Sequence, residues 1–160
     1  MGVGKGTTAR AFAKKYNIYN IDTDDLIESK EKKEVKKIFA KKGEAYFRAQ
    51  EQATADWIEK SVKGTLISCG GGFYKVNNLK KLGMIVLLDA SFEWIHNRLS
   101  TAKNAKAKLA KRPLFSQEKE AKKLYNEREK AYKKVADVII DVENLTLDEQ
   151  LEVIAKKCKI

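Results

Sequence analysis

The sequence predicts an α/β fold with a parallel sheet covered by helices on both sides. Short apolar runs alternate along the 160 residues with longer segments of helical period. Two of the runs, 84–88 and 138–140, are continuously apolar, as strands buried on both faces of a parallel sheet tend to be. The length, together with a single proline and no internal repeat, indicates one domain over residues 1–160.

The apolar spacing sets the expected order of elements. Strands are expected at 19–21, 65–68, 84–88 and 138–140. Helical periodicity predicts helices at about 5–16, 24–30, 33–42, 44–62, 91–100, 117–135 and 147–158. The polar stretch from Ser100 to Ser116, which contains the only proline, is typical of a mobile surface segment, and we expect a lid at about 101–117.

Composition excludes several classes of protein. Hydrophobic residues make up 43% and charged residues 34%, which excludes a disordered tail. No apolar stretch approaches the roughly 20 residues needed to cross a bilayer, and the start of the chain lacks the apolar core of a secretory signal. Cys69 and Cys158 lie far apart and fit no metal-ligand spacing. We therefore expect a reduced, cytoplasmic protein that does not contact a membrane.

The net charge of +11 comes mostly from lysines dispersed along helix-like segments. Dispersed lysine usually forms a solvated surface, although the excess could also attract anionic small molecules. The sequence shows no stacking pattern of aromatic and basic residues and no groove-reading motif. We therefore expect no nucleic-acid partner.

A glycine-rich loop opens the chain, from Gly2 to Thr7, and leads directly into a helical pattern. Glycines let backbone N–H groups turn toward a phosphate, the helix adds its positive dipole end, and Lys5 adds a charge for the β- and γ-phosphates. The alternative is an ordinary loop before a helix. The lysine in register favours a nucleotide site.

The loop departs from the common G-x-x-x-x-G-K-[ST] pattern in two ways. Its first glycine and the strand that feeds it would precede Met1, so we expect a truncated start or an internal methionine. Gly6 stands where a Ser or Thr hydroxyl usually ligates Mg²⁺. Thr7 carries the next hydroxyl along the chain, but this hydroxyl cannot be assumed to replace the missing Mg²⁺ ligand.

Acidic residues follow the first expected strand. In an extended segment Asp22 and Asp24 would point to the same side, into the crevice beyond the strand end. Asp22 could then meet the phosphates from the adjacent strand. The alternative is a helix N-cap before Leu26 and Ile27, and one residue can serve both purposes.

Further candidates lie downstream. The glycine triplet, Gly70, Gly71 and Gly72, follows the strand at 65–68 and would let a ligand touch backbone, although a plain turn explains it as well. Arg48 and Arg128 lie in helical segments and Arg112 in the expected lid. Each arginine taken alone is more often solvated or salt-bridged than functional.

Taken together, these stretches resemble the shikimate kinases, a family of the P-loop nucleoside-monophosphate-kinase-like group. GVGKGT, DTDDLIE, IFAKKGEAYFRAQE, the glycine triplet, RPL, ER-x-x-x-Y and VADVIID occur in the family's order over nearly the whole chain. The resemblance implies a three-layer P-loop kinase fold with a helical substrate-binding segment at about 23–50. It also implies transfer of the γ-phosphoryl group of ATP to the 3-hydroxyl of shikimate, as a step toward chorismate and the aromatic amino acids.

The resemblance also implies a role for each matching residue. Lys5 would hold the transferred group, Asp22 would organise Mg²⁺ through water, and Asp24 would bind the substrate hydroxyls and act as the base. Arg48 and Arg128 would hold the shikimate carboxylate, and Arg112 would close over ATP. The remaining contacts would come from Gly2, Val3, Gly4, Gly6 and Thr7 for ATP, from Gly70, Gly71 and Gly72 for shikimate, and from the 141–146 segment beside the adenine.

Two alternatives stay open. GKGT also resembles adenylate kinases, so another small-molecule kinase of the adenylate- or gluconate-kinase type is the first. The second is a catalytically impaired nucleotide-binding relative, because Gly6 lacks the hydroxyl. Asp24, Arg48 and Arg128 argue against degeneration because they would serve the second substrate alone. His96 matches no family site and is expected to be structural, and the protein is expected to be a monomer.

Overall fold

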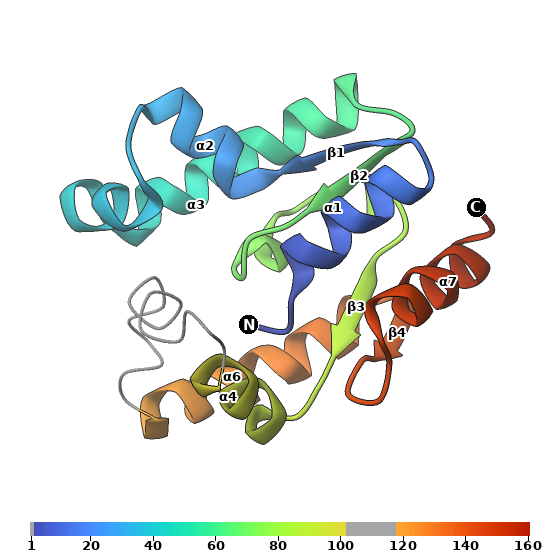
Figure 1. Ribbon diagram of the computed structural model, residues 1–160. Coiled ribbons are helices and arrows are strands. Elements are labelled where there is room, and N and C mark those ends of the chain that lie inside the picture. The colour runs from blue at the N-terminus through green and yellow to red at the C-terminus, as the bar shows by residue number, and fades with distance from the viewer. Residues whose placement is uncertain (1, 102–117) are drawn as a thin grey trace. The chain divides into compact units, whose positions relative to one another are not determined.

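The computed structural model describes residues 2–101 and 118–160 and divides the chain into two compact units. The first unit is Gly6–Met84, and the second unit combines Met1–Lys5 with Ile85–Ile160. Figure 1 shows their helices and strands. Each unit contains one parallel pair of strands with helices packed against it, so the predicted α/β class is confirmed. The expectation that residues 1–160 form one domain stays a prediction.

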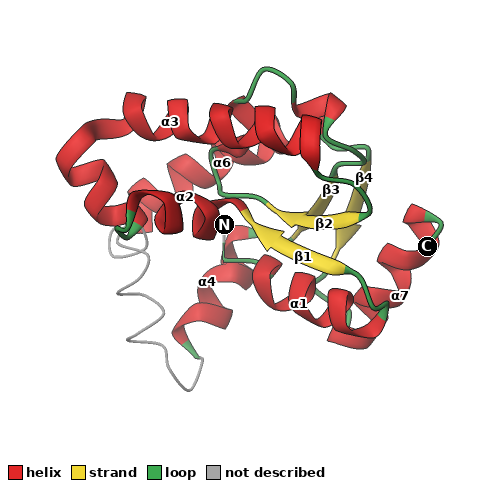
Figure 2. Ribbon diagram, turned by 90° about the horizontal axis from the view of Figure 1, so that it is seen from above, coloured by secondary structure: helices red, strands yellow, loops and turns green. Residues whose placement is uncertain are grey.

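In the first unit, α1 (Lys5–Lys15) leads to β1 (Tyr19–Asp22), α2 (Thr23–Glu31), α3 (Val35–Ser61) and β2 (Thr65–Ser68). The strands β1 and β2 pair in parallel, and the last residue pair of the ladder is Asp22 with Ser68. Figure 2 shows α1 and α3 on opposite sides of this pair. A short 3₁₀ turn, Phe73–Lys75, follows β2, and a second, Leu79–Lys81, comes next.

The helix α3 covers two segments that the sequence analysis predicted as separate helices. Helices were expected at 33–42 and 44–62, and the break falls at Gly43, whose φ of 78° and ψ of 173° are not helical. A positive φ suits glycine because it has no Cβ to clash with the backbone. After this kink, Phe47 packs with Ile27 and Ile38 in a small core that joins α2 to α3. Ala55 and Ile58 further along α3 pack against Ile21 of β1 and Ile67 of β2.

In the second unit, β3 (Val86–Asp89) and β4 (Val138–Asp141) pair in parallel, with Asp89 opposite Asp141. The helices are α4 (Phe92–Ser100), α6 (Glu118–Val135) and α7 (Leu147–Cys158). The expected burial of β4 on both faces is wrong, because Ile140 is buried whereas Ile139 is 45% exposed. This alternation is typical of a strand covered on a single face. The buried apolar side chains of the unit include Phe92, Ile95, Leu99, Ala121, Ile140, Val142, Leu151 and Ile154.

Candidate active site

The phosphate loop, residues 2–7, has the backbone that its sequence predicts. Gly4 has a φ of 104°, in the region that favours glycine, and a Cβ there would lie 2.6 Å from the Arg98 Nη1 atom. The helix α1 begins at Lys5, so its first N–H groups follow the loop directly. Its first turn carries no acidic residue that would compete with a phosphate. The arrangement can hold an anion at the helix N-terminus.

Arg98 contacts the phosphate loop, and the sequence did not indicate this contact. It lies on α4, donates from Nη1 to the Val3 carbonyl oxygen at 2.5 Å, and stacks over the Trp94 ring at 5.1 Å. The i,i+4 spacing of Trp94 and Arg98 predicts their stacking on one helix face. It does not predict that the guanidinium reaches the phosphate loop, because that contact joins parts of the chain 95 residues apart.

Asp22 ends β1 and is the N-cap of α2, so the capping interpretation of this residue is confirmed. Its Oδ1 accepts the Asp24 backbone N–H at 2.9 Å, and its Oδ2 accepts the Ser68 hydroxyl at 2.8 Å. The expected extended geometry through Asp24 is wrong. Asp22 is extended, but the helix that it caps begins at Thr23 and already contains Asp24. The two carboxylates therefore do not alternate along one strand.

The glycine triplet lies against the candidate substrate residues of the first unit. A Cβ on Gly70 would overlap the Asp24 Oδ1 atom, and a Cβ on Gly72 would overlap the Arg48 Nη1 atom. The Gly70 N–H donates to the Thr23 hydroxyl at 3.0 Å, and the Gly70 carbonyl accepts the Phe73 N–H at 3.1 Å. The segment is thus a turn, and its missing side chains also give room to a carboxylate and a guanidinium.

Arg48 is held by two carboxylates on its own helix. Its Nη1 donates to Glu51 Oε2 at 2.5 Å, and its Nη2 donates to Glu44 Oε1 at 2.9 Å. Burial opposes the charge, but the hydrogen bonds to Glu51 and Glu44 outweigh it and raise the pKa of Arg48. The guanidinium therefore stays charged and is fixed in direction beside Gly72. An anionic group is the partner that its remaining donors favour.

Glu51 is a second residue that the sequence did not single out. Its side chain is 2% exposed, and one oxygen, Oε1, has no hydrogen-bond partner in the part of the chain that the structure describes. A buried carboxylate is stable only beside a positive charge, which Arg48 supplies. The Arg–Glu spacing of i,i+3 predicts the pair, but this spacing is common on exposed helix surfaces. The spacing therefore does not indicate that Glu51 is buried.

Arg128 and Arg112 are the other two predicted arginines. Arg128 lies on α6 of the second unit and is half-buried. Arg112 and nearly all of the expected lid at 101–117 lie outside the described residues. Thr7 is exposed on the first turn of α1, and His96 stacks with the Phe92 ring at 5.9 Å, a structural contact. Of the predicted site residues, the structure thus brings Asp24, Arg48 and the glycine triplet together.

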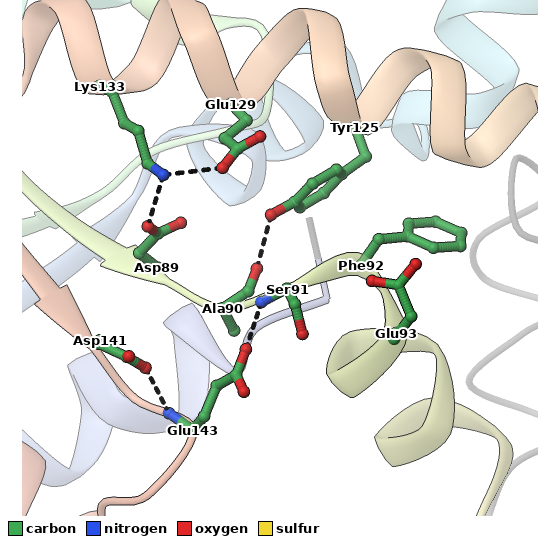
Figure 3. Close-up of a pocket in the computed structure, with 10 residues that line it drawn as sticks. All are labelled: Asp89, Ala90, Ser91, Phe92, Glu93, Tyr125, Glu129, Lys133, Asp141 and Glu143. Carbon is green, nitrogen blue, oxygen red and sulfur yellow. Dashed lines mark hydrogen bonds and ion pairs between the residues drawn. The ribbon is translucent and has the colours of Figure 1, made fainter.

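A pocket of about 360 Å³ lies at the carboxyl ends of β3 and β4 (Figure 3). Among the described residues that line it, Lys133 supplies the ammonium group, which pairs with Asp89 at 3.0 Å and with Glu129 at 2.7 Å. Burial, with the nearby carboxylates, raises the pKa of Tyr125 to about 12. The excess of carboxylates disfavours a phosphate here. The pocket lining includes Asp89, Glu93, Glu129, Asp141 and Glu143, of which the last two belong to the 141–146 segment.

The comparisons with known proteins agree on one family. A family model described as shikimate kinase matches residues 1–159. The chain is 39% identical over 141 residues to a shikimate kinase from Helicobacter hepaticus, covering 88% of this chain and 81% of that protein. It is 35% identical over 164 residues to one from Sulfurihydrogenibium sp., covering 99% of this chain and 93% of that protein.

Solved structures agree. A shikimate kinase from Bacteroides thetaiotaomicron matches with a TM-score of 0.83 at 25% identity, covering 100% of this chain and 94% of the other. A shikimate kinase from Acinetobacter baumannii in complex with shikimate matches with a TM-score of 0.76 at 25% identity, covering 98% and 87%. No helix within residues 2–101 and 118–160 is long and apolar enough to cross a membrane.

Proposed function

Since this chain belongs to the shikimate kinase family, we propose that it transfers the γ-phosphoryl group of ATP to the 3-hydroxyl of shikimate, which gives shikimate 3-phosphate and ADP. The chain is an ATP-dependent kinase that phosphorylates shikimate in the shikimate pathway. The assignment of the site residues rests on the close approach of Asp24 and Arg48 to the glycine triplet.

The phosphate loop and the N-terminus of α1 bind the phosphates of ATP. Gly2 to Thr7 supply backbone N–H groups, and Lys5 supplies a charge for the transferred group. Arg98 holds the loop through the Val3 carbonyl and so fixes the direction of those donors. Arg112 is the lid arginine that would close over ATP and exclude water, which competes with the acceptor hydroxyl. Phosphoryl transfer needs this positioning and charge neutralisation more than covalent help.

Mg²⁺ fits the donors of the first unit when it is held mostly by water and phosphate. The ion usually takes one or two carboxylates together with substrate phosphates and keeps several waters. Hydrogen bonds from the Asp24 N–H and the Ser68 hydroxyl fix the Asp22 carboxylate, and a carboxylate is a group that can accept a hydrogen bond from a metal-bound water. Gly6 offers no hydroxyl, and Thr7 is the nearest one in the sequence. When bound, the ion would neutralise charge on the β- and γ-phosphates.

Asp24, Arg48 and Arg128 bind shikimate in this proposal. Two guanidinium groups can hold a planar carboxylate by forked hydrogen bonds, which a lysine cannot reproduce. Glu51 and Glu44 fix the direction of Arg48, and the absence of a Cβ on Gly72 leaves room for its guanidinium. Asp24 orients the acceptor hydroxyl and takes its proton as the phosphoryl group transfers.

A coupled assay of ADP release tests the assignment against other kinases. We expect turnover with shikimate and none with AMP or gluconate as the acceptor. Turnover with AMP alone would refute the proposal, and ATP binding without turnover on any acceptor would indicate an impaired relative. We further propose that the protein works as a monomer in the cytoplasm. The exposed large hydrophobic residues of the described ranges are dispersed over separate segments, and a solution mass near 18.2 kDa is expected.

A further inference from the structure

We propose that Thr23 is a positioning residue that holds the glycine triplet at a fixed distance from Asp24 through one buried hydrogen bond. The proposal rests on the function proposed above, because its consequence is measured on shikimate. The sequence analysis assigned no role to Thr23. Asp22 is the N-cap of α2, which leaves the Thr23 hydroxyl for another contact.

Thr23 occupies the junction at which the β1–β2 ladder ends. The last ladder pair is Asp22 with Ser68, and beyond it β1 turns into α2 while β2 turns into the glycine triplet. The side chain of Thr23 is fully buried, at 0% exposed. Its Oγ1 accepts the Gly70 N–H at 3.0 Å. The hydroxyl thus takes the place of the backbone acceptor that a longer β1 would have offered to this N–H.

The bond fixes the spacing of two groups that face shikimate in the proposed site. Asp24 follows Thr23 in the first turn of α2, and the Cβ position of Gly70 lies 3.0 Å from the Asp24 Cγ and 3.1 Å from its Oδ2. The carboxylate and the triplet backbone therefore lie in contact. The Thr23 hydroxyl, on the residue next to Asp24, links α2 directly to the triplet, and a loss of this link lets the triplet move relative to Asp24.

A purely structural role makes a different prediction. If the Thr23 hydroxyl only satisfies a buried N–H, its removal lowers the melting temperature and leaves the kinetic constants unchanged. A positioning role changes the KM for shikimate and leaves the KM for ATP unchanged, because the bond joins α2 to the glycine triplet, which the proposed function assigns to shikimate and not to ATP. The two roles are thus separated by kinetics measured well below the melting temperature.

The experiment compares T23V, which keeps the shape and removes the hydroxyl, with T23S, which keeps the hydroxyl. A second pair, T23A against T23S, repeats the comparison without the γ-methyl group if T23V does not fold. T65V is the matched control, since Thr65 lies at the opposite end of β2 and its hydroxyl donates to the Lys63 carbonyl at 2.9 Å. We expect T23V to raise the KM for shikimate about tenfold, with T23S and T65V within about twofold of wild type.

Hydrogen exchange of the Gly70 amide gives a readout that does not depend on activity. We expect the amide to exchange at least about tenfold faster in T23V than in wild type and T23S. A wild-type KM for shikimate in T23V, or equal impairment of T23S and T23V, would overturn the proposal. If the wild-type chain did not phosphorylate shikimate, the proposed function would fall, and the exchange of the Gly70 amide would still decide whether the hydroxyl holds the triplet.

Discussion

Replacement of Gly72 by alanine isolates the contact between the glycine triplet and Arg48. The φ of −104° and ψ of −7° at Gly72 are open to any residue, so the alanine adds no backbone strain. Its Cβ, however, would overlap the Arg48 Nη1 atom and lie 2.7 Å from Nη2. Because non-bonded heavy atoms pack at about 3.5–4.0 Å, the guanidinium has to withdraw by about 2 Å.

The expected magnitude follows from the bonds that Arg48 makes. Hydrogen bonds to charged groups contribute about 1.5–3 kcal/mol each, and a guanidinium displaced by about 2 Å loses the geometry of those that it forms with the substrate carboxylate. Loss of one such bond corresponds to about a 10- to 100-fold weaker interaction. G72A should therefore raise the KM for shikimate by about that factor and leave the KM for ATP within about twofold of wild type.

A double-mutant cycle in the coupled ADP assay shows whether Gly72 acts through Arg48. If it does, G72A/R48A is no worse than R48A alone, because the contact that the alanine disrupts is already gone. Additive effects of G72A and R48A would refute the reasoning, as would a G72A enzyme with the wild-type KM for shikimate. Melting temperatures of the three variants establish that each is folded under assay conditions.

Three more predictions test other parts of the account. D24N should lower the kcat with shikimate about 100-fold or more, because an amide cannot take the hydroxyl proton, and near-normal turnover would remove Asp24 from the mechanism. G6S should lower the Mg²⁺ concentration that gives half-maximal activity, because it adds the hydroxyl that Gly6 lacks. The serine can be accommodated, since the flexible Arg10 side chain, 3.3 Å from the Cβ position, can move. An unchanged Mg²⁺ titration would show that the hydroxyl is dispensable. The pKa of Tyr125 is raised from 10.0 to about 12, so this residue's contribution to the free energy of unfolding is complete below pH 10 and is lost as the pH rises to 12. The difference in melting temperature between wild type and Y125F should therefore shrink over this range. A constant difference would contradict the prediction.

The sequence predicted the fold well because its signals were local. The apolar runs and helical periods located every strand and helix of the described residues to within a few positions, including the break at Gly43. Burial was less predictable. The continuous apolar run of β4 suggested two covered faces, yet Ile139 is exposed, because side-chain burial depends on which elements pack against a strand and not on the strand itself.

The candidate site was also predictable only in part. A motif indicated Asp24, Arg48 and the glycine triplet, and the structure brings them together in the first unit. The residues that hold them in place were not apparent. Glu51 lies in a spacing that is common on solvated helices, and the Thr23 hydroxyl meets its partner 47 residues away. Long-range contacts of this kind leave no periodic trace in a single sequence.

Equilibrium titration of shikimate into wild type, R48A and R128A tests the central claim most directly. Both variants are expected to bind shikimate about 100-fold more weakly, because each loses one of the two guanidiniums proposed to hold the carboxylate. Both are expected to bind ATP as the wild type does. Shikimate affinity unchanged in either variant, or ATP affinity lowered as much as shikimate affinity, would contradict the claim that these arginines recognise the acceptor.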